Sequence, residues 1–99
     1  MVFGYSATFV TLPGRRDEFA SILREGFGTL ADAGCRLYLI AASSDDEGTL
    51  TVTELWDSRD QHDASLQNPA AREAIARALP LLAAPPSGQE FPVLGAHLG

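Results

Sequence analysis

The chain has 99 residues, a formal net charge of −6, 45% hydrophobic side chains and 20% charged ones, which is typical of one soluble globular domain spanning 1–99. The acidic balance argues against a nucleic-acid partner, because no basic cluster could replace the counterions of a phosphate backbone. A single cysteine excludes an internal disulfide and a cysteine-based metal site. No apolar run is long enough for a membrane span, so we expect a cytoplasmic protein without a membrane partner.

The first third of the chain predicts a strand followed by a helix. The stretch VFGYSATFVT, Val2 to Thr11, is rich in aromatic and β-branched residues, and its alternation places Phe3, Tyr5, Ala7 and Phe9 on one face. LPGRRDEF ends this strand, because proline cannot continue a ladder and glycine suits a turn. Helical spacing then follows up to Gly34, a left-handed cap, with apolar residues at Phe19, Ile22, Leu23, Phe27 and Leu30.

The middle of the chain predicts a β-hairpin. Two apolar runs, Cys35 to Ala42 and Thr49 to Trp56, are joined by the polar turn SSDDEG. Alternation along the second run places four side chains on one face of the sheet: Leu50, Val52, Glu54 and Trp56.

The last third predicts helical segments and a final strand. Ser58 and Gln61 match a capping box, and Asn68 before Pro69 starts a second helical segment. We expect the buried side of that segment to carry Ala71, Ile75 and Leu79. Pro80 should end it, and EFPVLGAHL, Glu90 to Leu98, predicts a short edge strand.

The resulting order, β-α-β-β-α-β, predicts an α+β fold of the ferredoxin-like class, with one antiparallel sheet and helices on one face. The other face of that sheet would still carry Val10, Leu37, Leu39 and Leu55. A face this apolar should not remain in water, so we expect a homodimer formed sheet to sheet.

The junction TELWDSRDQHDASL, Thr53 to Leu66, is the candidate site. It brings Glu54, Trp56 and His62 together where a strand ends and a helix begins, beside a mostly apolar space of the kind that binds small molecules. Structural roles stay open for each: a core tryptophan, a carboxylate paired with Arg36 or Arg59, and a locally hydrogen-bonded histidine. We expect Asp63 to point away from His62.

Other chemistries find less support in the sequence. His62 and His97 lack the spacing of a metal site, and no phosphate-binding or dinucleotide fingerprint is present, so we predict no metal and no cofactor. Ser65 lies near His62, but a serine–histidine mechanism would also need a third partner and an oxyanion site.

Four segments together resemble the antibiotic biosynthesis monooxygenase family, including its quinol-monooxygenase relatives. They are LPGRRDEFASIL, the Gly34–Cys35 pair, VTELWDSRDQHDASL and NPAAREAIARALPLLA, so that the resemblance runs from about Tyr5 to Ala83. It implies a dimeric α+β barrel with a pocket between sheet and helices in each protomer. It also implies oxidation of phenols, anthrones or quinols by molecular oxygen without metal or flavin.

Carried over residue by residue, the resemblance to the actinorhodin-type anthrone oxygenase keeps the active-site tryptophan at Trp56. His62 stands where that enzyme has tyrosine, and Val52 where it has asparagine. The residues that the haem-degrading branch needs are replaced by Ala7, Ser65 and Ile75, so haem degradation is not expected.

We therefore predict a cofactor-independent monooxygenase that oxidises a quinol, an anthrone or another polycyclic phenol. His62 would accept the proton, Trp56 would pack on the aromatic substrate, and Glu54 would orient His62 or a bound water. The expected pocket residues are Tyr5, Phe9, Tyr38, Val52, Ser65 and Leu66. Two alternatives use the same pocket: a non-catalytic small-molecule-binding dimer, and a polyketide cyclase or isomerase.

Overall fold

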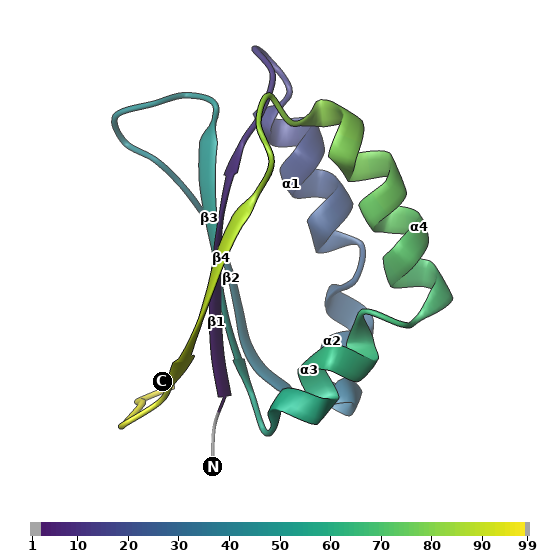
Figure 1. The fold of residues 1–99 in the computed structure, drawn as a ribbon, viewed down its shortest axis with the longest axis vertical. Coiled ribbons are helices and arrows are strands. Elements are labelled where there is room, and N and C mark those ends of the chain that lie inside the picture. The colour runs from purple at the N-terminus through teal and green to yellow at the C-terminus, as the bar shows by residue number, and fades with distance from the viewer. Residues whose placement is uncertain (1–2, 99) are drawn as a thin grey trace.

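The computed structural model describes residues 3–98, which form four strands and four α-helices in one body (Figure 1). The strands are β1 (Phe3–Val10), β2 (Cys35–Ala42), β3 (Thr49–Trp56) and β4 (Ser87–Pro92). The α-helices are α1 (Arg16–Arg24), α2 (Phe27–Ala33), α3 (Arg59–Ser65) and α4 (Pro69–Ala78), and a short 3₁₀ turn covers Leu79–Leu81.

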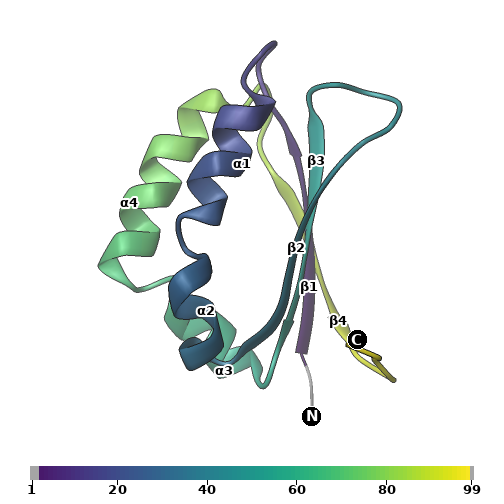
Figure 2. The same cartoon turned by 180° about the vertical axis from the view of Figure 1, so that it is seen from behind.

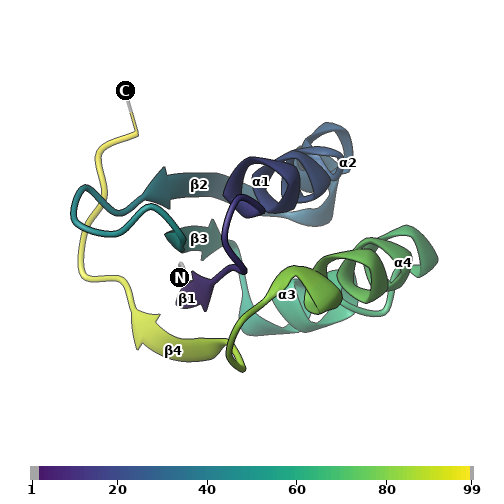
Figure 3. The ribbon, with the colours of Figure 1, turned by 90° about the horizontal axis from the view of Figure 1, so that it is seen from above.

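The four strands form one antiparallel sheet in the order β2-β3-β1-β4. All four helices cover the same face of this sheet, as the front and back views show (Figures 1 and 2). Seen from above, the molecule is therefore a sheet layer and a helix layer (Figure 3). This arrangement confirms the ferredoxin-like α+β fold.

The space between the two layers has an aliphatic end and an aromatic end. At the aliphatic end, most side chains are Ala, Ile and Leu, and Leu50 of β3 and Ala78 of α4 are buried in one cluster with Phe19 of α1. The ring of Phe9 packs on Phe19 with centroids 5.0 Å apart. At the other end, near α2 and α3, the interior holds rings and titratable groups instead, and that end contains the candidate site.

The first helical stretch differs from its prediction, because it is divided in two. α1 ends at Arg24 and α2 begins at Phe27, and two glycines, Gly26 and Gly28, lower the helix propensity around the break. The predicted cap at Gly34 is confirmed, since this residue has a φ of 97° in the left-handed region.

The predicted buried side of the last helical segment is wrong at two of its three positions, since only Ala71 is half-buried. Ile75 and Leu79 are 40% and 51% exposed, whereas Ala78 is buried and Ala74 packs against the core. Small alanine side chains allow α4 to approach the core closely, and this turns the larger Ile75 and Leu79 away from it. Asn68 does cap α4, because its side chain accepts a hydrogen bond from the Ala70 amide.

The two terminal strands are shorter than, or displaced from, the predicted ranges. β4 covers Ser87–Pro92 rather than Glu90–Leu98, and it ends at a proline, which has no N–H for a further ladder bond. In the first strand, Val2 lies outside the described residues, and Thr11 makes only an isolated bridge with Leu82. Within residues 3–98, no helix has the length and apolar character needed to cross a membrane.

Candidate functional site

His62 is held inside the aromatic end by the start of α3. The Ser58 side chain caps this helix by accepting a hydrogen bond from the Gln61 amide at 3.1 Å, as predicted. The imidazole one turn later is only 7% exposed. Three rings surround it, with centroids at 5.4 Å for Phe3, 5.0 Å for Tyr5 and 5.5 Å for Trp56.

The polar contacts of this cluster differ from those that the sequence suggested. The Trp56 indole N–H donates to Glu54 Oε1 at 2.9 Å, and His62 Nε2 lies 4.0 Å from the same oxygen. The direct partner of the imidazole is instead Asp63, whose Oδ1 is 3.1 Å from Nδ1. The expectation that Asp63 points away from His62 is therefore wrong.

The two arginines considered as partners for Glu54 are engaged elsewhere. Arg36 forms a two-bond ion pair with Asp57, and Arg59 pairs with Glu90 at 2.6 Å. Glu54 thus lies between Trp56 and His62, which are the neighbours that the site hypothesis requires.

Burial of Glu54 raises the pKa of its carboxyl, while the hydrogen bond from Trp56 and the nearby His62 act in the opposite direction. Two groups on β2 respond to the same surroundings. Burial, followed by the charge of Glu54, raises the pKa of the Tyr38 phenol and raises the pKa of the Cys35 thiol to about 11. This end of the interior therefore disfavours the charged forms of its acidic groups.

The six predicted pocket residues lie in several places. Tyr5 packs on His62, and its hydroxyl lies where a Cβ on Gly88 would be, so a larger residue at that position of β4 would force the Tyr5 ring to shift. Tyr38 lies on the α2 side, with its ring 5.5 Å from that of Phe27. Ser65 donates to the backbone carbonyl of His62 at 2.6 Å rather than to its ring.

The other three predicted residues lie farther from the imidazole cluster or are covered. Phe9 belongs to the aliphatic end, Val52 is 1% exposed, and Leu66 is 44% exposed at the end of α3.

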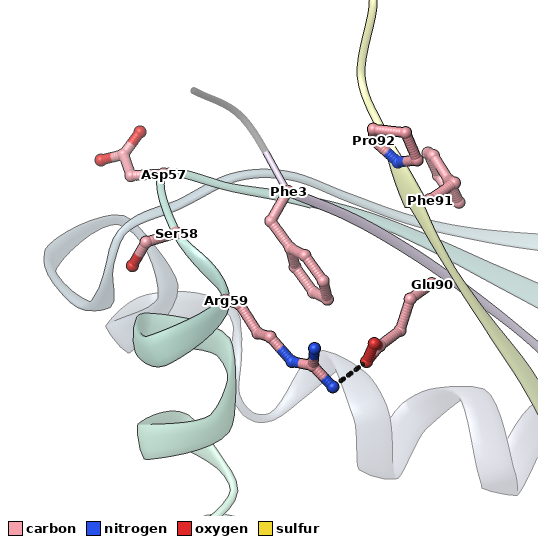
Figure 4. A pocket seen from close by; sticks show the side chains of 7 residues that line it. All are labelled: Phe3, Asp57, Ser58, Arg59, Glu90, Phe91 and Pro92. Atoms are coloured by element: carbon pink, nitrogen blue, oxygen red, sulfur yellow. Dashed lines mark ion pairs between the residues drawn. The ribbon is translucent and has the colours of Figure 1, made fainter.

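A cavity of about 580 Å³ opens between β4 and the start of α3, next to the cluster. None of the predicted site residues lines it; its lining consists of Phe3, Asp57, Ser58, Arg59, Glu90, Phe91 and Pro92. Figure 4 shows the Phe3 ring projecting into this space, with the Arg59–Glu90 ion pair beside it. Because Phe3 also packs on His62, one ring separates the cavity from the imidazole.

Sequence reasoning missed three residues that connect the cluster with the cavity: Phe3, Arg59 and Asp63. A signal existed for Phe3, since alternation places it on the same face as Tyr5. Arg59 and Asp63 occupy neighbouring turns of one helix, a spacing typical of ion pairs, and the structure puts their charged atoms 3.9 Å apart.

The fold and the sequence together identify the family of the chain. The family model described as Antibiotic biosynthesis monooxygenase matches residues 3–77, more than half of the chain. The chain belongs to the antibiotic biosynthesis monooxygenase family. This confirms the resemblance seen in the sequence, and the matched segment contains the whole imidazole cluster.

Solved structures of this family share the fold over nearly the whole chain. A protein of Chloroflexus aurantiacus, named "putative Antibiotic biosynthesis monooxygenase", has 35% identity and a TM-score of 0.83, with 100% of both chains covered. A protein of the same designation from Caulobacter crescentus has 23% identity and a TM-score of 0.86, with 95% of this chain and 91% of that chain covered. No curated protein sequence matches the chain. Among residues 3–98, no group of three or more His, Cys, Asp or Glu side chains could hold a metal ion.

Proposed function

We propose that this family member is a cofactor-independent monooxygenase that oxidises a quinol, an anthrone or another polycyclic phenol with molecular oxygen. The observation that supports it most is the buried His62 imidazole, which lies among three aromatic rings and between two carboxylates. Imidazole is the side chain best suited to proton transfer near neutral pH, and a planar phenol is a natural partner for such rings.

The reaction needs a base more than it needs a redox group. Removing a proton from an electron-rich phenol or anthrone gives an anion that can pass one electron to triplet oxygen. In the complete reaction, a ring carbon gains one oxygen atom and becomes a carbonyl, and the second oxygen atom leaves as water with the two hydrogens lost by the substrate. All four electrons come from the substrate, so the balance requires no external reductant.

In this proposal His62 takes the proton, and Trp56 and Tyr5 form the aromatic wall. The substrate binds in the cavity beside Phe3, whose volume of about 580 Å³ lies in the usual range for small-molecule sites. A turn of the Phe3 side chain would bring the acidic edge of the substrate to the imidazole. The water-poor interior that raises the pKa of Glu54 would also protect a reactive anion.

The test is oxygen uptake by chelator-treated, flavin-free protein across a panel of quinols and anthrones, with His62→Ala as the comparison. We expect uptake with at least one member of the panel and its loss in the variant. Product formed under argon would instead favour the cyclase or isomerase, and ligand binding without turnover would favour the non-catalytic dimer. Activity that vanishes with chelator and returns with iron or copper would contradict the cofactor-independent reaction.

We also propose that the protein acts as a homodimer. On the helix-free face of the sheet, Val10 and Leu39 are 36% and 50% exposed. Leu55, on the same face, is already buried; it lies beside Gly4, and the Phe91 ring covers that glycine. Beyond β4, Leu94 is fully exposed at 100%. A second copy placed sheet to sheet would cover this surface and bury more than about 1,000 Å² in total.

A further inference from the structure

The imidazole of His62 has two nitrogens in different surroundings, and Asp63 distinguishes them. Asp63 is 61% exposed, and its Oδ1 lies 3.1 Å from His62 Nδ1. An ionised carboxylate only accepts hydrogen bonds, so this contact is favourable only when Nδ1 carries the proton. In neutral His62 the lone pair then resides on Nε2.

The other nitrogen faces the buried side of the cluster. Nε2 lies 4.0 Å from Glu54 Oε1, which is longer than a hydrogen bond, and that oxygen already accepts the Trp56 N–H. With the proton on Nδ1, the Nε2 lone pair is therefore free to accept a proton from a substrate in the interior. With the proton on Nε2, the N–H would point toward the Glu54 carboxyl, and the lone pair would lie on Nδ1, facing Asp63 instead of the interior.

Asp63 is itself held in place from the cavity side. Its Oδ2 is 3.9 Å from Arg59 Nε, and Arg59 Nη2 binds Glu90 Oε1 at 2.6 Å across the cavity (Figure 4). A chain of charged groups thus runs from the cavity rim on β4, through Arg59 and Asp63, to the imidazole. Glu54 of β3, Asp63 of α3 and the Tyr5 phenol of β1 are the titratable groups that face His62.

We propose that Asp63 is a positioning residue that holds His62 in its Nδ1–H tautomer, so that Nε2 is the proton acceptor. This inference rests on the proposed function for its catalytic consequence, but not for the tautomer itself. The carboxylate partner of a metal-bound histidine is worth roughly 10- to 100-fold in activity, and we expect a factor of the same size for this metal-free pair. Asp63→Ala should therefore lower kcat by about that factor while leaving KM nearly unchanged.

The decisive experiment is nitrogen NMR of protein labelled at histidine, recorded at a pH where the His62 ring is neutral. The chain has two histidines, so His97→Gln assigns the spectrum, and His97 itself reports an exposed ring. We expect protonated Nδ1 and unprotonated Nε2 for His62, and a shift toward the reverse in Asp63→Ala. The control is Asp60→Ala, which removes the same charge from an exposed position on the same helix.

Each outcome bears on one claim. Wild-type His62 protonated at Nε2, or an Asp63→Ala protein that keeps the Nδ1–H form, would overturn the role of Asp63 whatever the activity. Equal loss of kcat in Asp63→Ala and Asp60→Ala would also overturn it, since a general charge effect would then suffice. Wild-type protein that consumes no oxygen would refute the proposed function, and the spectrum would still decide the tautomer.

Discussion

Replacing Glu54 by glutamine should stabilise the protein relative to the wild type at neutral pH. This gain in unfolding free energy should shrink as the pH falls. Glu54 is 9% exposed, and burial raises the pKa of its carboxyl above the ordinary 4.5. The folded state therefore binds this proton more tightly than the unfolded state does. The stabilisation from protonated Glu54 is fully present below about pH 4.5 and is lost as the pH rises through the higher folded-state pKa.

The size of the effect follows from that linkage. Each unit by which the pKa is raised corresponds to about 1.4 kcal/mol of unfolding free energy at pH values above the folded-state pKa. One kcal/mol moves the Tm of a domain of this size by about 4–8 °C. Glutamine keeps a carbonyl oxygen for the Trp56 N–H and carries no charge, so the variant avoids the cost of burying a carboxylate.

The assay is urea unfolding of both proteins from about pH 4, near the ordinary carboxyl pKa, to about pH 8. The quantity compared at each pH is the difference between their unfolding free energies. Taking the difference cancels the opposite contributions of Glu25, Asp46 and Asp57, whose pKa values are lowered by their partners. Glu47→Gln, at an exposed position of the β2–β3 turn, is the matched control. A difference between wild type and Glu54→Gln that stays constant with pH, as in the control, would refute the reasoning.

Three further predictions test the other parts of the site. His62→Ala should lower kcat by roughly 10²–10⁴-fold with a smaller change in KM, and steady-state kinetics that show near-normal turnover in a folded variant would leave His62 a structural role. Trp56→Phe should lower the unfolding free energy measured in urea by roughly 2–4 kcal/mol, because Trp56 is 1% exposed and its N–H donates to Glu54. A loss below about 0.5 kcal/mol would mean that the indole N–H contributes little to stability. Leu39→Asp should convert a dimer to a monomer in light scattering, whereas a wild-type mass of 10.5 kDa at micromolar concentration would contradict the dimer.

The fold could be predicted from the sequence because local patterns and chain order agree. Alternation placed Phe3 with Tyr5 on one face of the first strand, and Glu54 with Trp56 on one face of the third. The observed register brings these two faces together, because it pairs Phe3 with Trp56 and Tyr5 with Glu54. Turn and cap signals at Ser58 and Asn68 located two helix starts. The error in α4 arises where packing overrides periodicity, since Ala74 and Ala78 allow a closer approach than Ile75 and Leu79 would. The error in β4 has another cause, because this strand ends at Pro92, which has no N–H for a further ladder bond.

The site was only partly predictable, because side-chain partners depend on rotamers and on contacts between distant segments. The cluster of Glu54, Trp56 and His62 follows from facing positions on β3 and α3. The contact of His62 with Asp63 does not, since adjacent residues on a helix point about 100° apart before their side chains turn. The cavity depends on β4, which pairs with β1 and lies at Ser87–Pro92, closer to the N-terminus than the predicted Glu90 to Leu98.

The central claim is that a base in this cluster, without a cofactor, allows molecular oxygen to oxidise a phenolic or anthrone substrate. Isotopically labelled oxygen tests it most directly, with chelator-treated wild-type protein and a substrate identified by oxygen uptake. We predict that one labelled atom enters the product carbonyl, that the other appears in water, and that His62→Ala abolishes both. Unlabelled product, labelled hydrogen peroxide in place of labelled water, or incorporation that depends on added metal or flavin would contradict the account.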